Sequence, residues 1–167
     1  MRRWSVGVAV AALALGARAA EAQRSVRFGA NMSFASDDRN FGLGARVNVD
    51  LERVARWKNF EGVGSFDYFF PSSKGLPVDV NYWELNGNGI YKITSVKGSV
   101  LPYVGSGLNV AHGSGTALGY GGGSTELGLN LLGGVRFKIN NRLTPFAEAK
   151  VELGGGDLFM ISGGVHF

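Results

Sequence analysis

The stretch Leu127–Ile139, LGLNLLGGVRFKI, decides the fold class because apolar residues recur in it at every second position. Its even positions are mostly small or polar, whereas the large apolar side chains at odd positions are Leu127, Leu129, Leu131, Val135, Phe137 and Ile139. A period of two is the pattern of a β-strand with two different faces. Because the alternation runs for more than ten residues, it indicates a strand that crosses a bilayer with one face in lipid.

The first 22 residues have the features of a secretory signal peptide. Arg2 and Arg3 precede an apolar stretch, Val6–Ala17, and the sequence Ala20-Glu21-Ala22 supplies an A-x-A cleavage site. About 12 apolar residues are too few for a transmembrane helix, which needs ~20. We therefore predict that residues 1–22 are a cleaved signal peptide and that residues 23–167 form a single domain.

Composition excludes several classes of protein. Removing the charged residues of the signal, Arg2, Arg3, Arg18 and Glu21, from the 17 basic and 13 acidic residues leaves a net charge of +2. No stripe of Lys and Arg interleaved with aromatic residues along one face resembles a nucleic-acid-binding surface, so we expect no nucleic-acid partner. The chain has no cysteine, so it forms no disulfide. Its 27 glycines fall largely inside alternating segments, where a curved barrel uses them at bends and close approaches.

The alternation recurs along the chain and predicts eight strands of about ten residues, the number found in the smallest membrane barrels. The predicted strands are Val26–Phe34, Phe41–Glu52, Phe60–Phe70, Val80–Ile93, Val100–Ala111, Thr125–Ile139, Thr144–Leu153 and Leu158–Phe167. The predicted fold class is all-β, an eight-stranded antiparallel up-and-down transmembrane β-barrel. Val54–Trp57 could form a helical turn, and His112–Ser124, rich in Gly and Ser, is predicted as the longest loop. The faces of Val100–Ala111 cannot be assigned from the pattern.

The chain resembles the eight-stranded outer-membrane β-barrel family, which includes the OmpA-type and OmpW-type barrels and the opacity-like porin family. The residues that carry the resemblance are Pro102–Leu108 (PYVGSGL), Gly133–Phe137 (GGVRF), Pro145–Ala149 (PFAEA) and Gly163–Phe167 (GGVHF). The resemblance implies a location in the cell outer membrane, part of the cell envelope. It also implies insertion by the outer-membrane assembly machinery, which reads a last strand ending in an aromatic residue, here Phe167.

The polar face of the predicted strands carries charges of both signs. The predicted lumen charge network consists of Arg46, Asp50, Glu61, Asp67, Glu84, Arg136, Lys138, Glu148 and Lys150. The interior of an eight-stranded barrel is just wide enough to be filled by side chains, and charges confined there must pair. We therefore expect a crosslinked polar plug with a structural role or limited passive passage of small solutes, and we keep a conducting pore as an alternative. No spacing of metal ligands is present, and we expect no metal and no cofactor.

His112, Ser114 and Glu126 form a second candidate site. The order H-x-S with a downstream Glu is similar to that of outer-membrane lipid A deacylases, in which Ser attacks an ester, His takes its proton and Glu orients His. Gly115 follows the serine where that family has Asn, and the three residues fall on the third outer hairpin rather than the last. We therefore expect a non-enzymatic protein and keep the deacylase-like esterase as an alternative.

Periodicity alone leaves one further alternative, a soluble lipocalin-like ligand-binding barrel with its apolar face turned inward. The short chain and the terminal Phe167 favour the membrane. The partners expected for a membrane barrel are outer-membrane lipid, lipopolysaccharide and the assembly machinery. We expect the protein to be a monomer.

Overall fold

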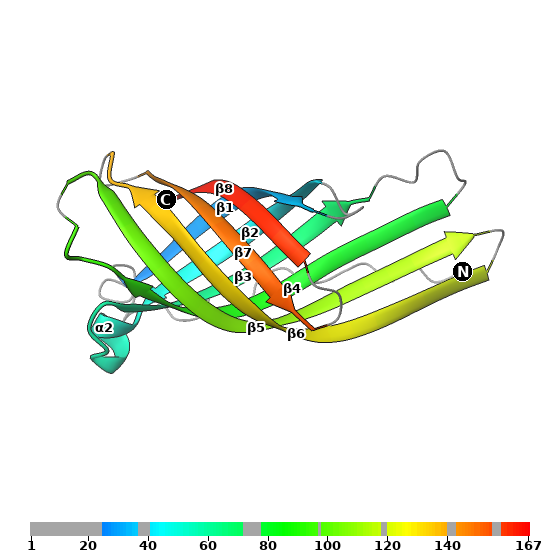
Figure 1. The fold of residues 1–167 in the computed structure, drawn as a ribbon, viewed down its shortest axis with the longest axis horizontal. Coiled ribbons are helices and arrows are strands. Elements are labelled where there is room, and N and C mark those ends of the chain that lie inside the picture. The colour runs from blue at the N-terminus through cyan, green and yellow to red at the C-terminus, as the bar shows by residue number, and fades with distance from the viewer. Residues whose placement is uncertain are drawn as a thin grey trace, which may run out of the picture.

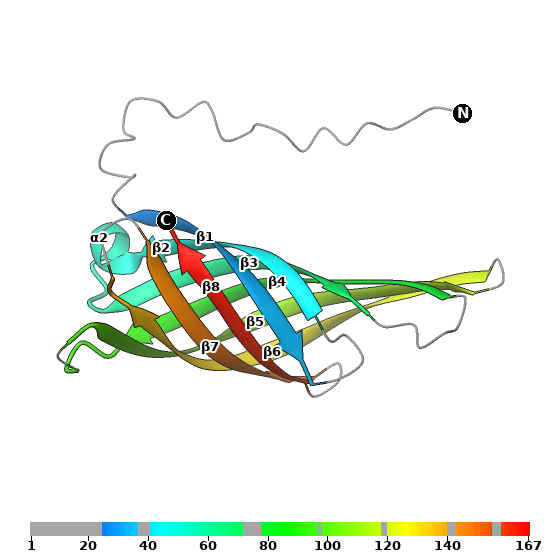
Figure 2. The same cartoon turned by 90° about the horizontal axis from the view of Figure 1, so that it is seen from above.

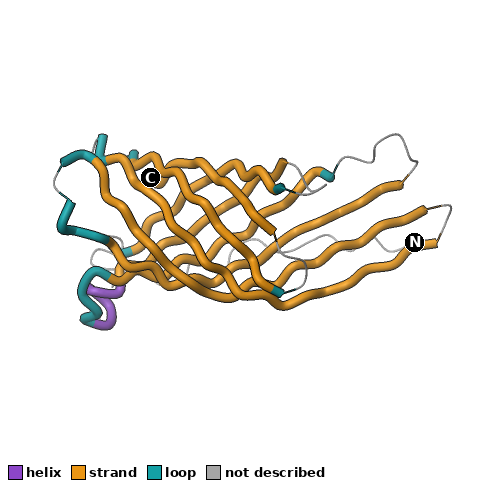
Figure 3. The backbone as a smooth tube through the Cα atoms, viewed as in Figure 1, coloured by secondary structure: helices purple, strands orange, loops and turns teal. Residues whose placement is uncertain are grey.

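The computed structural model describes residues 25–36, 41–71, 78–96, 98–117, 120–139, 143–154 and 158–167. Eight antiparallel strands in these ranges close into one barrel (Figures 1 and 3). Their bounds are β1 Val26–Ala35, β2 Phe41–Asp50, β3 Phe60–Phe70, β4 Val78–Lys92, β5 Val100–Ala117, β6 Tyr120–Phe137, β7 Thr144–Leu153 and β8 Leu158–His166. A short helix, α2 (Leu51–Ala55), connects β2 to β3. The predicted signal peptide lies outside the described residues.

Each strand pairs with its neighbours in the chain, and β1 pairs with β8 to close the barrel. The closing register sets Gly29 opposite His166 and Ser33 opposite Ser162. This is the all-antiparallel up-and-down topology predicted from the alternation, so the predicted fold class is confirmed. Among the described residues, no helix is both long enough and apolar enough to span a membrane.

The first strand begins, and the last strand finishes, at the same end of the barrel (Figure 2). The Phe167 backbone N–H donates a hydrogen bond to the Phe28 carbonyl at 2.9 Å, and the Asp50 N–H donates to the Ser25 carbonyl at 2.7 Å. We call this end, which also carries α2, the terminal end, and the opposite end the distal end. At the distal end β4, β5 and β6 extend beyond the other strands (Figure 1).

The two faces of the strands have opposite character. Large apolar side chains point outward and are exposed, including Leu127 at 75 % and Phe66 at 45 %, whereas the carboxylates of Glu61 and Glu84 are fully buried in the lumen. A soluble barrel would turn its apolar face inward. The structure therefore contradicts the lipocalin-like alternative, and the outer wall is one that lipid covers.

The prediction that His112–Ser124 forms a loop is wrong. Most of its residues continue β5 and β6, which stay paired in an unbroken register from Val100↔Phe137 to Ala117↔Tyr120. Gly, Ser and Thr in this stretch suggested a turn, but small residues permit strand pairing where the backbone groups find partners across the hairpin. The same register settles the face of β5 that the pattern left open, because Tyr103 and Asn109 are buried in the lumen and Val104 is exposed outside.

The second predicted strand ends earlier than expected. Glu52 belongs to α2 rather than to β2, and the predicted helical turn at Val54–Trp57 starts at Leu51. Asp50 causes the change, because its side chain accepts a hydrogen bond from the Glu52 N–H at 3.1 Å and caps the helix. Arg56, with φ of 59°, ends the helix in the left-handed conformation.

Glycines on the lumenal face make room for larger neighbours. A Cβ atom built on Gly134 would lie 2.6 Å from the Ala147 carbonyl oxygen and 2.5 Å from the Tyr103 hydroxyl, whereas one built on Gly87, on the outer face, meets nothing within 4 Å. We predict that Gly134→Ala lowers the free energy of unfolding by about 1–3 kcal/mol because it overpacks the lumen. Gly87→Ala is the matched control and should change it little.

Both variants would be compared with the wild type by urea titration of tryptophan fluorescence in detergent micelles. Equal stability of the two variants would contradict the steric role assigned to Gly134.

Candidate functional site

The lumen of the barrel holds ionised side chains of both signs. Alternate residues of each strand point into the lumen, and these charged residues occupy such positions within a strand or at its end. The described lumenal cations are Arg27, Arg46, Lys92, Arg136 and Lys150, and the described lumenal anions are Asp50, Glu61, Asp67, Glu84, Glu148 and Glu152. Most of these groups are buried, so their interactions are little screened by water.

An ion pair spans the middle of the bore. The Arg46 Nη2 atom of β2 lies 2.8 Å and 3.0 Å from the two carboxylate oxygens of Glu148 on β7. The Tyr103 hydroxyl of β5 donates to the same carboxylate at 2.8 Å. The Arg46 guanidinium also stacks 4.6 Å from the centre of the Phe146 ring. Strands that are three places apart around the closed barrel are thus joined through the lumen.

A second cluster surrounds Glu61 at the terminal end. Its carboxylate accepts hydrogen bonds from Arg136 at 2.8 Å and from Arg27 at 3.2 Å. Lys92 lies 3.9 Å from Glu61 and 3.6 Å from Asp50, so it bridges the two acids. The Arg136 guanidinium lies 5.1 Å from the centre of the Tyr103 ring, which connects this cluster to the central pair.

A third cluster, toward the distal end, is built around a lysine. Lys150 Nζ lies 2.6 Å from Glu152 and 3.3 Å from Glu84, and it donates to the Asn86 side-chain carbonyl at 3.1 Å. Asp67 is held instead by neutral donors. Its carboxylate accepts hydrogen bonds from Asn31 at 2.7 Å and from Ser65 at 3.0 Å.

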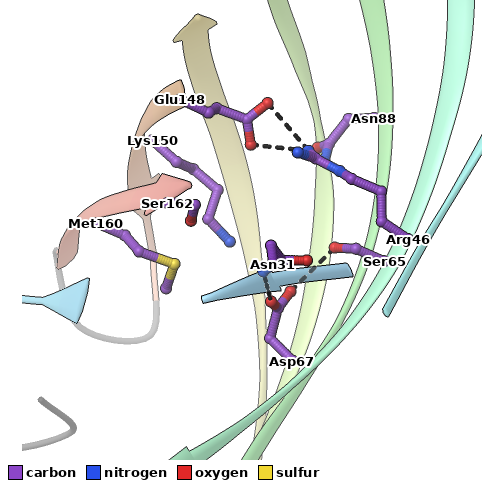
Figure 4. A pocket seen from close by; sticks show the side chains of 9 residues that line it. All are labelled: Asn31, Arg46, Ser65, Asp67, Asn88, Glu148, Lys150, Met160 and Ser162. Atoms are coloured by element: carbon purple, nitrogen blue, oxygen red, sulfur yellow. Dashed lines mark hydrogen bonds and ion pairs between the residues drawn. The ribbon is translucent and has the colours of Figure 1, made fainter. Parts of the chain in front are cut away.

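A space remains between the central pair and the distal cluster, and Figure 4 shows the side chains that surround it. It is a cavity of about 10 Å³ lined by Asn31, Arg46, Ser65, Asp67, Asn88, Glu148, Lys150, Met160 and Ser162. A cavity of this size is about large enough for one water molecule. Among the described residues, side chains therefore fill most of the bore at this level.

The structure brings together most of the residues that the sequence assigns to the lumen. Eight of the nine, all except Lys138, take part in the contacts described above. Lys138 is corrected to a surface residue, because β6 ends at Phe137 and the Lys138 side chain is exposed. Sequence reasoning missed Tyr103, whose face could not be assigned, and the amide side chains that link the charges, such as Asn31 and Asn86.

The second candidate site is not assembled. Glu126 pairs with Ala111 and His112 with Thr125, so Glu126 points to the opposite face of the hairpin from His112 and Ser114. The His112 Nδ1 atom hydrogen bonds with the Thr125 hydroxyl at 2.8 Å instead. Within the described part of the chain, no group of three or more His, Asp or Glu side chains could hold a metal ion.

Comparison with known proteins gives a likeness in shape only. No protein-family model and no curated protein matches this sequence. The N-terminal β-barrel domain of Pseudomonas aeruginosa OprF matches with a TM-score of 0.69 and 16 % identity, covering 86 % of this chain and 96 % of that one. Neisserial surface protein A matches with a TM-score of 0.62 and 19 % identity, covering 84 % and 94 %. The chain has the fold of an outer-membrane β-barrel.

A third solved structure has a fold similar to that of this outer-membrane barrel. Ail, the attachment invasion locus protein of Yersinia pestis, matches with a TM-score of 0.51 and 16 % identity, covering 86 % of this chain and 97 % of that one. The shared fold and the exposed apolar outer wall together support localisation of the protein in the outer membrane.

The central ion pair of this outer-membrane barrel should dominate the response to lumenal mutation. We predict that Arg46→Gln lowers the free energy of unfolding by about 3–5 kcal/mol, because Glu148 then stays buried without its cation. The double variant Arg46→Met/Glu148→Leu should recover most of this loss, since it removes both charges. Unfolding would be followed by urea titration in detergent micelles.

Arg53→Gln is the matched control, because it removes an exposed pair in which Arg53 lies 4.0 Å from Asp50. Its effect should stay below about 1 kcal/mol. A loss of the same small size for Arg46→Gln would contradict the central role of the Arg46–Glu148 pair.

Proposed function

We propose that this protein is a non-enzymatic outer-membrane barrel with a structural role in the cell envelope. The observation that carries the proposal is the Arg46–Glu148 pair, which joins β2 to β7 through the lumen with N–O distances of 2.8 Å and 3.0 Å. A pore-forming role would need a continuous aqueous path, and the cavity beside this pair has room for about one water molecule. Passage is therefore limited to water or small ions when the pair separates.

The cost of opening supports this role. Separating the Arg46–Glu148 pair in a narrow bore leaves two charges with little water to solvate them, and breaking a buried pair costs several kcal/mol. Tyr103 raises that cost, because its hydroxyl also donates to Glu148. Opening is thus rare, and the main consequence of the network is a mechanically crosslinked barrel.

The proposed partners follow from the outer surface. The exposed apolar wall binds outer-membrane lipid and, in the outer leaflet, lipopolysaccharide. Phe167, exposed at the end of β8, serves as the signal for the outer-membrane assembly machinery. The protein acts as a monomer, since a single chain supplies all eight strands and closes the barrel by pairing β1 with β8.

Planar-bilayer recording tests the proposed closure. The purified wild-type protein, shown to be folded by a different gel migration before and after boiling, should give no steady conductance steps. Arg46→Ala/Glu148→Ala should produce discrete steps, because it removes both side chains that cross the bore. Lys138→Ala, which alters an exposed charge outside the lumen, should behave like the wild type. Regular steps from the wild-type protein would refute the plug.

Lipid A analysis tests the proposed absence of catalysis. Cells that express the protein and cells that lack it should show the same lipid A acylation by mass spectrometry, because His112 pairs with Thr125 rather than with Ser114. Loss of one acyl chain in the presence of the wild-type protein, and its restoration in Ser114→Ala, would replace this proposal with the deacylase-like alternative.

A further inference from the structure

A basic and aromatic patch lies on α2 and the turn that follows it, at the terminal end of the barrel. We define the α2 patch by five exposed residues, Arg53, Val54, Arg56, Trp57 and Lys58. The helix projects from the barrel end beside the strands rather than over the bore (Figures 1 and 2). No residue of α2 is fully buried, and Val54 in the helix and Trp57 after it are exposed, so packing against the barrel does not explain these two side chains.

The apolar members of the patch are continuous with the lipid-facing wall. Trp57 is 61 % exposed and its ring centre lies 6.4 Å from that of Phe60, with the two rings nearly perpendicular. The centre of the Phe60 ring in turn lies 5.2 Å from the centre of the Tyr91 ring on the outer face of β4. Val54, in the preceding helix, is 64 % exposed. The aromatic wall therefore extends past the strands onto the turn, and lipid that covers Phe60 and Tyr91 also reaches Trp57.

The basic members of the patch lie next to this aromatic edge. Arg53 has a weak contact with Asp50 at 4.0 Å, and among the described residues Arg56 and Lys58 have no carboxylate within 4.0 Å. Glu52 is the one acid of α2, and its carboxylate accepts a hydrogen bond from the Asn59 N–H at 3.4 Å. The patch therefore keeps a net positive charge beside the aromatic edge of the outer wall.

Local geometry fixes the patch in place. The Trp57 N–H donates to the Leu51 carbonyl at 3.1 Å, and the Phe60 N–H donates to the Trp57 carbonyl at 3.2 Å. Arg56 and Asn59 both have positive φ, at 59° and 64°, so the turn reverses tightly and returns the chain to β3. The backbone that carries Trp57 and the neighbouring basic residues is thus held in a defined turn at the end of the barrel.

We propose that the α2 patch binds the anionic headgroups of the phospholipid leaflet at the terminal end, with Trp57 in the interface and Arg53, Arg56 and Lys58 facing the phosphates. Amphipathic aromatic rings prefer the headgroup level of a bilayer, and basic side chains beside them are attracted to anionic lipid. This inference rests on the proposed membrane location. Continuity with the lipid-facing wall favours lipid over an acidic protein partner.

Lipid selectivity of the folded protein tests the proposal. The mature chain would be reconstituted in phosphatidylcholine vesicles that contain spin-labelled phosphatidylglycerol or spin-labelled phosphatidylcholine, and the motionally restricted fraction measured by electron spin resonance. We expect the wild type to prefer phosphatidylglycerol by at least about fivefold, since a single basic side chain contributes roughly that much at an anionic surface and the patch has three. Arg53→Gln/Arg56→Gln/Lys58→Gln should lose most of this preference.

The single variants Arg56→Gln and Lys138→Gln form a matched pair. Each removes one exposed charge near the terminal end, but only Arg56 belongs to the patch. Arg56→Gln should reduce the preference and Lys138→Gln should leave it unchanged. Equal selectivity of the triple variant and the wild type would overturn the proposal. The substitutions do not threaten folding because α2 buries no side chain, and gel migration before and after boiling checks this.

Fluorescence quenching separates failure of this inference from failure of the membrane location. In the variant Trp83→Phe, Trp57 is the remaining tryptophan of residues 23–167. Phosphatidylcholine brominated near the carbonyl end of its acyl chains should quench Trp57 more than lipid brominated near the methyl end. Unquenched Trp57 together with quenched Trp83 in Trp57→Phe would place the patch in water and overturn the proposal. Absence of quenching in both variants would instead refute membrane insertion.

Discussion

Ionised side chains in a bore too narrow for bulk water must neutralise one another, and the polar interior of this barrel is arranged around that requirement. The Arg46–Glu148 pair meets it at the centre, where the guanidinium approaches both carboxylate oxygens. A lone charge at this depth would lose its hydration without gaining a partner, which is far more costly than leaving it in water. Each described cation in the lumen therefore lies beside at least one acid, and the Asp67 carboxylate accepts hydrogen bonds from an amide and a hydroxyl donor, Asn31 and Ser65.

Tyr103 shows how the separate clusters become one network. Its hydroxyl donates to Glu148, and its ring lies beneath the Arg136 guanidinium that binds Glu61. The ring can occupy this position only because Gly134 has no side chain. Glycines in the strands thus help to form the charge network, because a glycine on one strand leaves space for a long polar side chain from another strand.

The sequence predicted which strand residues face inward, because apolar residues must face the lipid and charged residues must face the lumen. Strict alternation placed Arg46, Glu61 and Glu148 inside correctly, because a slip by one residue would expose every charge to lipid. It could not predict which charges pair, since Arg46 and Glu148 are 102 residues apart and meet only after the barrel closes. Nor could it place Tyr103, because apolar residues occur on both faces of β5 and no charge marks the inner one.

The wrong sequence predictions concern residues that are constrained neither by lipid on the outer face nor by the packed charges of the lumen. The hairpin beyond His112 lies past the end of β7 pairing, which stops at Leu129↔Leu153, so its side chains need not alternate and its glycines suggested a loop. Lys138 follows the end of β6 and can reach water. At the terminal end, Asp50 stops β2 by capping α2, a local effect that periodicity does not reveal. The wrong predictions therefore lie at strand ends, where hairpin pairing and helix capping rather than the alternation of side chains determine the local structure.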